Sequence, residues 1–492
     1  MGIVIKQTIK GSFYAYLGVI IGGVNVAILL PLLFSEAQIG LVNILVSVSA
    51  ILAQISCLGG NGIISYFFPR FHDKASVQKD FFSFVWIYSM LGFAVFYSLF
   101  LLFGDHLLAG KSADAQTLRE YSVMLFPLTF FTLAFLLVDT FASSTLNATI
   151  GSFYKELVMR LVNTALIVLF YFELIDFRLF MWLYVANFAI PVVAITVHLF
   201  RKREISLCWP SKTKYLPHLK TMASIGIFFI LNGLSNSLAI YIDKLMITYY
   251  LGLKETGIYS ITNFIGTVVR IPRLAMGKIS TPIIAQALND GDYKSLEKFF
   301  RLSVLSQVIV GLLIFIPIWI NIDIFLALLP PSYLEGKMVV FYISLSFLVT
   351  CFLGIGIQVI QLSKHYKLIT YFNLIAGIAV VVLNALFIPI WGITGAASAT
   401  LASKVLLVIL FLFVLHKRFH FRVLFADSAL VVLISSLVIA GALYLPVGQF
   451  VEQKFVNGGI NIIIRTVITL AVWGLALKVT GLFKRVKFKE IV

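Results

Sequence analysis

Long apolar segments separated by short polar turns are the dominant pattern along this chain. Each apolar run is about 20 residues long, which is the length that an α-helix needs to cross the hydrocarbon core of a bilayer. A membrane β-barrel would instead show short segments in which apolar and polar residues alternate. The pattern therefore predicts an all-α polytopic membrane protein with about fourteen transmembrane helices. The predicted spans lie near residues 13–34, 39–64, 81–104, 119–144, 153–173, 178–200, 222–251, 257–286, 299–321, 337–362, 367–389, 392–415, 424–446 and 460–482.

The composition agrees with this pattern. Hydrophobic types make up 60% of the 492 residues and charged types 12%, with a mean hydropathy of +1.01. A water-soluble domain carries about a quarter charged residues, because its surface must be polar. In a soluble protein the net charge of +17 would suggest nucleic acid. In a membrane protein Lys and Arg collect in the cytoplasmic loops, so we expect no nucleic-acid partner.

The loops between the predicted spans carry very unequal numbers of basic residues. With the N-terminus inside, the inner segments hold 24 Lys and Arg, whereas the outer loops hold six. The positive-inside rule then predicts that both termini are cytoplasmic and that the number of spans is even. We expect a multi-pass protein of the bacterial inner (plasma) membrane.

A weak internal repeat relates the two halves of the chain. At an offset of 217 residues three positions match, which are Gly40 with Gly257, Asp73 with Asp290, and Phe82 with Phe299. Each half thus has an outer turn ending in Gly, a long helix, an inner loop with Asp, and a helix that opens with Phe. Two six-helix halves with a substrate path between them are a common plan among transporters.

The longest polar insertion begins at Arg201-Lys202-Arg203, between the sixth and seventh predicted spans, and is a natural linker. We therefore expect two six-helix lobes followed by two C-terminal helices. The expected domains are an N-lobe at 1–204, a cytoplasmic linker at 205–221, a C-lobe at 222–418, and two further helices with a basic cytoplasmic tail at 419–492.

Ionisable residues inside the spans are costly in lipid, so each should face a cavity or a partner. The eighth span is the densest, and it contains Gly266, Arg270, Arg273 and Gly277. Their spacings of 4, 3 and 4 place them on one helical face, and Pro272 is expected to bend the helix there. Two guanidinium groups on a bent helix suit a diphosphate, since each presents a planar fork of donors. The alternative is that both side chains extend to the cytoplasmic interface.

Four further charged residues inside the spans are candidates for the transport path, namely Lys404, Lys244, Asp139 and Asp243. We expect Lys404 and Lys244 to add to a cationic cavity with the arginines. Asp243 can pair with an arginine, bind a proton or Na⁺, or form a structural ion pair. Asp139 is an isolated carboxylate that can take up protons in a transport cycle or pair with Arg160.

Signatures of an enzyme are absent from the sequence. It has no Gly-x-x-x-x-Gly-Lys-Ser/Thr phosphate loop and no His-Glu-x-x-His zinc motif, and its three cysteines form no Cys-x-x-Cys pair. The outer loops are short, whereas a membrane polymerase or ligase would carry acidic residues in a long one. We therefore expect a transporter that is not an enzyme, with no cofactor other than H⁺ or Na⁺ for coupling.

Five segments carry a resemblance to a known family. They are Tyr16-Leu-Gly18-Val-Ile-Ile-Gly22 with Pro31 and Gly40-Leu41; Tyr66-Phe-Phe-Pro69-Arg70-Phe71; Asp243-Lys244-Leu-Met246 followed by Glu255-Thr-Gly257-Ile-Tyr259-Ser260; Ile271-Pro272-Arg273 through Ile279-Ser-Thr-Pro282-Ile-Ile-Ala285; and Asn384 with Gly392-Ile-Thr-Gly395-Ala396-Ala397. With these segments the chain resembles the polysaccharide-exporter branch, the O-antigen type flippases, of the multidrug/oligosaccharidyl-lipid/polysaccharide (MOP) flippase superfamily. The likeness runs from the first to the twelfth span, and none of the segments is a catalytic signature.

The resemblance implies two six-helix lobes, arranged as an inverted V around a central cationic cavity, and two extra helices. It implies alternating access that carries an undecaprenyl-diphosphate-linked glycan (an O-antigen, capsule or exopolysaccharide repeat unit) from the cytoplasmic to the periplasmic leaflet. The basic cavity residues of the family carry over to Arg270 and Arg273, with Lys404 as a further candidate. A cation-coupled cycle is also implied, for which Asp139 and Asp243 are the candidates. A glycan polymerase and a chain-length regulator are the implied protein partners.

The first span departs from two neighbouring groups of the superfamily. Lipid II flippases usually carry a basic residue there and drug exporters often carry an Asp, and residues 13–34 hold neither. This departure counts against a cation-coupled multidrug exporter and a lipid II flippase, which are the alternative interpretations.

Overall fold

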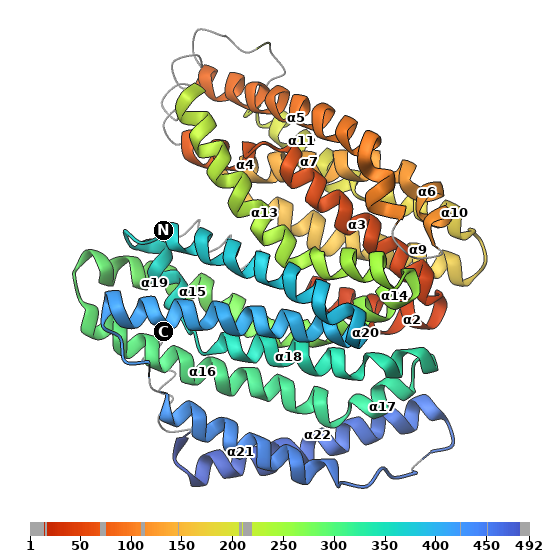
Figure 1. Ribbon diagram of the computed structural model, residues 1–492, viewed down its shortest axis with the longest axis vertical. Coiled ribbons are helices and arrows are strands. Elements are labelled where there is room, and N and C mark those ends of the chain that lie inside the picture. Colours follow the sequence, from red (N-terminus) through yellow and green to blue (C-terminus); the bar gives the residue numbers. More distant parts are fainter. Residues whose placement is uncertain are drawn as a thin grey trace. The chain divides into compact units, whose positions relative to one another are not determined.

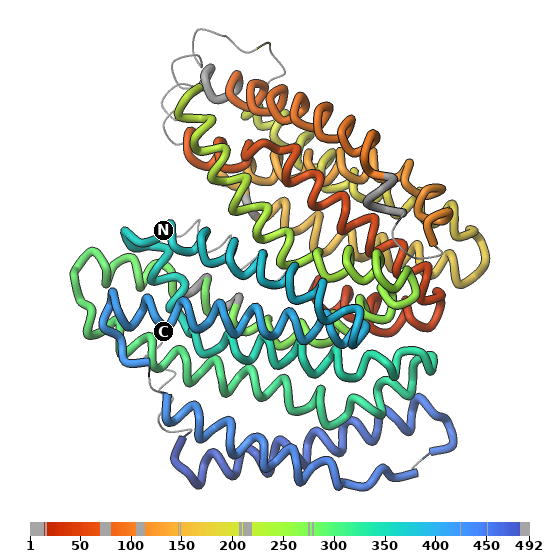
Figure 2. Tube along the Cα trace, in the orientation of Figure 1, coloured from red at the N-terminus to blue at the C-terminus, as the bar shows by residue number. Residues whose placement is uncertain are grey.

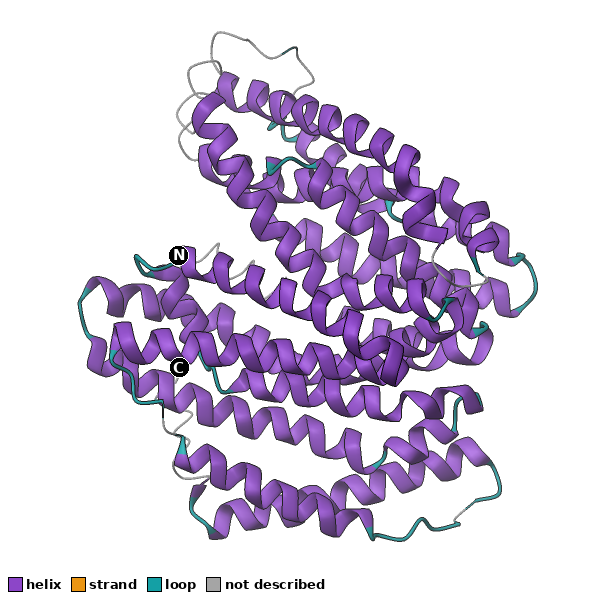
Figure 3. Ribbon diagram, in the orientation of Figure 1, coloured by secondary structure: helices purple, strands orange, loops and turns teal. Residues whose placement is uncertain are grey.

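The computed structural model describes residues 17–68, 75–109, 114–145, 147–205, 219–423, 425–449 and 451–482, together with Tyr14 and Trp209. Within these residues every regular element is a helix and none is a strand (Figure 3). Ten of the described helices are long and apolar enough to cross a membrane. The predicted all-α fold is therefore confirmed, and the chain is a multi-pass membrane protein.

The helices follow one another along the chain with short connections (Figure 1). The first fifteen are η1 (Asn25–Leu29), α2 (Leu30–Leu33), α3 (Glu36–Ser56), α4 (Gly60–Phe67), α5 (Ala75–Ala109), α6 (Ala115–Tyr121), η3 (Ser122–Met124), α7 (Leu125–Ser144), α8 (Ala148–Ser152), η4 (Phe153–Val158), α9 (Met159–Tyr171), α10 (Phe177–Asn187), α11 (Ala189–Arg201), α13 (Leu219–Tyr250) and α14 (Leu253–Thr267). The remainder are η6 (Val268–Arg270), α15 (Ile271–Asn289), α16 (Tyr293–Ile320), α17 (Ile322–Ala327), η7 (Pro331–Gly336), α18 (Lys337–Cys351), α19 (Gly356–Leu362), α20 (Lys367–Phe419), α21 (Ala426–Leu443) and α22 (Lys454–Val479). Of the η segments, η1 and η4 are π-helical and the others are 3₁₀ helices.

Three predicted spans lie outside these ten long helices because their helix is short or interrupted, and two others are merged into one of the ten. The first span is the shorter apolar helix Leu17–Leu33. The fifth is divided between η4 and α9, and the eighth between α14, η6 and α15. The eleventh and twelfth spans together form α20. Each predicted span therefore coincides with helix in the part of the chain that the structure describes.

The 53-residue helix α20 is a hairpin of two spans. Gly392 has φ 58° and ψ −139°, a conformation that only glycine adopts readily, and it separates the two helical halves. A Cβ on Gly395 would overlap the carbonyl of Phe387, and the Ser403 hydroxyl donates to the carbonyl of Ala376 at 2.8 Å. Both contacts join the halves in antiparallel register, and the trace shows the cyan and blue halves side by side (Figure 2). The break predicted at residues 389–392 is confirmed.

The chain forms two compact units, Met1–Gly257 and Ile258–Val492. In the first unit α13 packs against α3 and α4. The lobe boundaries expected from the repeat stay a prediction. Most of the expected linker (206–208 and 210–218) and the basic tail (483–492) lie outside the described residues.

The first unit contains a reciprocal glycine contact between α3 and the start of α14. A Cβ on Gly40 would overlap the carbonyl of Leu253, and a Cβ on Gly257 would overlap the carbonyl of Glu36. Gly40 and Gly257 are related by the offset of 217 residues, and so are Glu36 and Leu253. A contact in which two equivalent residues exchange the same partners is typical of a local two-fold axis. The weak sequence repeat therefore corresponds to a symmetric contact in space.

In the second unit α16 packs against both C-terminal helices, α21 and α22. The α16 helix begins at a cap, since the Asp292 carboxylate accepts a hydrogen bond from the Ser295 amide at 3.0 Å. Hydrogen bonds from the Ser295 side chain and amide hold the pKa of Asp292 below its usual value. Arg465 of α22 is buried, and its guanidinium donates to the carbonyls of Leu445, Ile320 and Ala442 at 2.8, 3.0 and 3.2 Å. It thus joins the C-terminal ends of α16 and α21, whose last carbonyls lack helical partners.

The glycine contact leads to a stability prediction. We expect Gly40→Val to lower the free energy of unfolding by about 1–3 kcal/mol, because the new side chain must displace the Leu253 backbone. The matched control is Gly23→Val in the first helix, where an added Cβ meets no atom within 4 Å. Thermal unfolding of the purified protein in detergent measures both variants, and equal unfolding temperatures would contradict the prediction.

Candidate functional site

The six predicted site residues fall into the two units. Asp139, Asp243 and Lys244 belong to the first unit, and Arg270, Arg273 and Lys404 belong to the second. The structure brings the three cations of the second unit to the surroundings of α18, and each group is described here within its own unit.

Arg270 and Arg273 lie where the eighth predicted span is interrupted. Arg270 ends the 3₁₀ segment η6, and Pro272 stands in the first turn of α15, where its missing N–H is tolerated. The bend expected at Pro272 stays a prediction, and the structure shows that the span is interrupted by η6 directly before this residue. Arg270 is exposed and Arg273 is half-buried, and the charges of the two side chains act on each other. A 3₁₀ stretch inside a longer helix often marks a hinge.

The two glycines beside the arginines make close contacts with neighbouring helices. Gly266 packs against α18, where an added Cβ would lie 2.8 Å from the side chain of Ile343. Gly277 packs against α19, where an added Cβ would lie 2.6 Å from the side-chain nitrogen of Gln358. A 3₁₀ helix turns about 120° per residue instead of about 100°, so η6 displaces the stripe that connects these glycines with the arginines. The four residues therefore do not follow one straight stripe along a regular α-helix, because the 3₁₀ turn at η6 rotates the residues that follow it. The side chain of the neighbouring Lys278 lies outside the described residues.

Lys404 of α20 reaches across to α18. Its Nζ donates to the Ser346 hydroxyl at 3.0 Å and lies 3.3 Å from the centroid of the Phe347 ring. An ammonium over an aromatic face is stabilised by the ring quadrupole, most strongly where water is excluded. Lys404 is therefore held at a defined place and is half-buried.

Arg273 and Lys404 approach successive turns of α18. The charge of Arg273 acts on Cys351, and Lys404 covers Phe347, four residues earlier. Residues four apart lie on one helical face, so both cations follow the same face of α18. We refer to Arg270, Arg273 and Lys404 as the cationic cluster, because the charges of the two arginines act on each other and Arg273 and Lys404 interact with one face of α18. Planar guanidinium forks with a nearby ammonium are suited to hold phosphate groups.

Lys244 and Asp243 adjoin each other on α13 in the first unit. The Lys244 ammonium donates to the Asn43 side-chain oxygen on α3 at 2.7 Å, and the charge of Asp243 acts on it as well. Asp243 is buried and has interaction partners of its own. Lys244 therefore joins α13 to α3. This structural role was not part of the expectation that it lines the cavity.

Asp139 on α7 packs directly against Gly151 of α8, where any Cβ would overlap its carboxylate. The cation that acts on it is Lys155, whose Nζ lies 4.2 Å from the ring of Phe135, one turn before Asp139. Arg160, the alternative partner considered from the sequence, is engaged elsewhere. Its guanidinium pairs with Glu156 at 2.6 Å and donates to the carbonyl of Gly18.

The Arg160 ion pair lies against the first helix. A Cβ on Gly22 would overlap the Arg160 guanidinium, so the glycine leaves the space that the side chain occupies. The Asn25 amide, in the π-helical segment η1, donates to the Arg160 carbonyl of α9 at 3.2 Å. The first helix carries no basic residue, and the positive charge beside it is neutralised by Glu156.

Sequence analysis did not identify the polar partners of the candidate cations. Asn43 and Ser346 lie inside predicted spans, and the side-chain oxygen of each accepts a hydrogen bond from a lysine on another helix. A single polar residue in an apolar helix commonly marks such an interhelical contact, and this was the signal available in the sequence.

No protein-family model and no curated protein matches the sequence. Among solved structures, the lipid II flippase MurJ in an inward closed conformation is similar at 15% identity and a TM-score of 0.67, over 96% of this chain and 99% of that one. An inward-facing multidrug resistance MATE family transporter of the MOP superfamily is similar at 16% identity and a TM-score of 0.63, over 83% of this chain and 94% of its own. A MOP superfamily transporter from Pyrococcus furiosus is similar at 16% identity and a TM-score of 0.53, over 85% and 95%. This chain therefore has the fold of MOP superfamily transporters, as predicted.

The contact between Lys244 and Asn43 leads to a second prediction. We expect Asn43→Leu to destabilise the protein by about 1.5–3 kcal/mol, because a half-buried ammonium loses its hydrogen-bond acceptor. The double variant with Lys244→Met removes both partners, so it should be less destabilised than the sum of the two single variants. Thermal unfolding of the three variants in detergent measures the coupling, and strict additivity would show that the two side chains do not interact.

Proposed function

We propose that this protein is a flippase that moves an undecaprenyl-diphosphate-linked glycan from the cytoplasmic to the periplasmic leaflet of a bacterial inner membrane by alternating access. The cargo is an O-antigen, capsule or exopolysaccharide repeat unit. A glycan polymerase and a chain-length regulator would receive it on the far side. The cationic cluster of Arg270, Arg273 and Lys404 is the observation on which this proposal rests.

The cluster suits a diphosphate for chemical reasons. Two guanidinium groups next to a 3₁₀ interruption present forks of donors, and Lys404 adds a third positive charge fixed on the same face of α18. A diphosphate carries negative oxygens that such forks bind in pairs. A cationic drug would be repelled by the same cluster, which favours an anionic cargo over a drug.

The extent of the fold similarity supports a lipid-linked cargo. The match with the lipid II flippase covers 96% of this chain, so it necessarily includes most of residues 419–492, which form the two C-terminal helices. The match with the multidrug transporter covers 83%. A lipid-linked cargo keeps its polyprenyl tail in the bilayer while its polar part passes through the protein.

Coupling to H⁺ or Na⁺ is part of the proposal, with Asp139 and Asp243 as the carboxylates involved. Both lie in the first unit and inside membrane-spanning helices. Asp139 interacts electrostatically with Lys155, and Asp243 with Lys244. Binding of a cation to either carboxylate changes the balance of an existing charge pair, which is a local event able to bias a conformational equilibrium.

The central test removes both guanidinium groups. We expect Arg270→Ala with Arg273→Ala to reduce transport about tenfold or more, since each charge-assisted hydrogen bond contributes about 1.5–3 kcal/mol. The measurement is flipping of a fluorescent undecaprenyl-diphosphate trisaccharide in proteoliposomes, with surface glycan of the producing cell as the second readout. The matched control is Arg201→Ala with Arg418→Ala, both exposed at helix ends. Unchanged surface glycan at normal protein levels would refute the assignment of the site.

The fold similarity also favours a second candidate, a lipid II flippase, because of the match with MurJ. The same proteoliposomes distinguish the cargoes when they are supplied in turn with the lipid-linked trisaccharide, lipid II or the cationic dye ethidium. We expect transport of the trisaccharide and exclusion of the dye by the positive cluster. Transport of lipid II alone would assign the second candidate, and transport of the dye alone would assign a drug exporter.

A further inference from the structure

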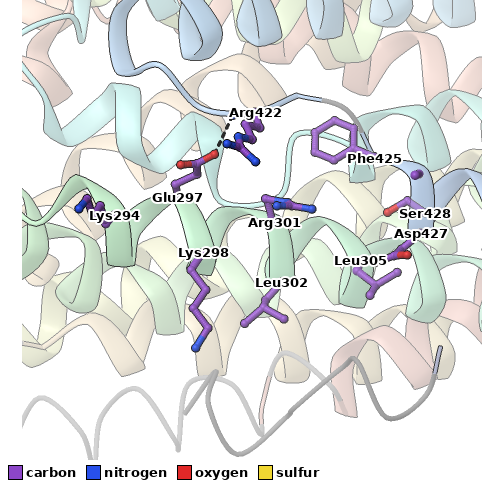
Figure 4. A pocket seen from close by; sticks show the side chains of 11 residues that line it. Lys294, Glu297, Lys298, Arg301, Leu302, Leu305, Arg422, Phe425, Asp427 and Ser428 are labelled. Atoms are coloured by element: carbon purple, nitrogen blue, oxygen red, sulfur yellow. Dashed lines mark hydrogen bonds between the residues drawn. The ribbon is translucent and has the colours of Figure 1, made fainter. Parts of the chain in front are cut away.

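A pocket of about 570 Å³ lies in the second unit, where α16 begins and the chain passes from α20 to α21 (Figure 4). Its walls come from the first turns of α16, from Arg422 and from residues 425–428. It does not contain Arg270, Arg273 or Lys404, so it is a site separate from the cationic cluster.

The polar part of this pocket carries an excess of positive charge. Four cations line it, which are Lys294, Lys298, Arg301 and Arg422, against the two carboxylates Glu297 and Asp427. Glu297 is engaged with the backbone, since its carboxylate accepts a hydrogen bond from the Arg422 amide at 2.9 Å. This contact holds Arg422 against α16. In Figure 4 Arg422 lies next to Glu297, and Arg301 extends below Phe425.

The remaining part of the pocket is apolar. Leu302, Leu305 and Phe425 line it, and on α16 the two leucines directly follow the charged turns. The same helix continues as a membrane-spanning segment to Ile320. The pocket thus changes from cationic to apolar along α16 in the direction in which that helix enters the bilayer. A membrane interface has this gradient, with phosphate groups outside and acyl chains inside.

We propose that this pocket binds the phosphodiester headgroup of an anionic phospholipid. Arg301 and Arg422 hold the phosphate through charge-assisted hydrogen bonds, and the acyl chains lie over Leu302, Leu305 and Phe425. Basic pockets between membrane helices on the cytoplasmic side suit such headgroups, and the loop charges predict that this end of α16 is cytoplasmic. A bound headgroup contacts both α16 and the segment leading into α21, and so stabilises the docking of the C-terminal helices. The proposal is independent of the cargo that the protein transports.

The test removes the two guanidinium groups of the pocket while it leaves the fold contacts in place. In Arg301→Gln with Arg422→Gln the backbone hydrogen bond to Glu297 remains possible, and both side chains are exposed. We expect binding of phosphatidylglycerol to the purified protein to weaken about 30-fold, and binding of phosphatidylcholine to be unchanged. The probe is a fluorescent phosphatidylglycerol titrated in detergent, with native mass spectrometry of retained lipid as the second readout.

A matched control separates this pocket from general surface charge. Lys417→Gln with Arg418→Gln removes the same charge from the last turn of α20, at the same end of the unit but outside the pocket. This control should bind phosphatidylglycerol as the native protein does. An equal loss in the control would overturn the proposal, and so would native affinity in the Arg301 and Arg422 double variant.

Two further arms complete the test. Inorganic phosphate at the same concentration should not displace phosphatidylglycerol, because it lacks acyl chains, and equal displacement would reassign the pocket to free phosphate and overturn the lipid proposal. Should the double variant fail to fold, Arg301→Gln alone is expected to weaken binding about fivefold. Unchanged affinity in that single variant would overturn the proposal as well.

Discussion

The hydrocarbon core of a bilayer offers no hydrogen-bond partner, and the rest of this structure depends on how the chain meets that constraint. Most of the described backbone in the predicted spans is helical, so its amides are paired internally. The exceptions are local and each has a reason. The turn at Gly392 needs a conformation open to glycine, and the carbonyls at the ends of α16 and α21 receive the guanidinium of Arg465.

Charged side chains inside the spans are subject to the same lack of polar partners, and they fall into two groups. Lys244 and Arg160 are each held by a partner on another part of the first unit, and their charge stabilises helix packing. The charges of Arg270 and Arg273 instead act on each other, and Arg273 and Lys404 both interact with residues of α18. Like charges that act on each other inside a membrane protein are unfavourable without a counter-charge, and the proposed function rests on this feature.

The reciprocal glycine contact gives the internal repeat a physical meaning. Three matches at a fixed offset are weak in an apolar sequence, but Gly40 and Gly257 are also the residues at which α3 and α14 meet. Only glycine permits backbones to approach so closely, so the contact requires glycine at both matched positions. The same fold in MOP superfamily transporters is retained at about 15% identity, which is consistent with a small number of such constraints.

The sequence by itself determined the helical class, the approximate spans and the break at residues 389–392. These features depend on hydropathy over about 20 residues or on the backbone of a single Gly or Pro, and both are local. Only the tertiary structure decided which charge meets which partner. Lys244 and Asn43 are 201 residues apart, Lys404 and Ser346 are 58 apart, and the pocket at the start of α16 joins residues more than one hundred positions apart. A partner at such a separation is selected by the packing of helices, which hydropathy and periodicity do not encode.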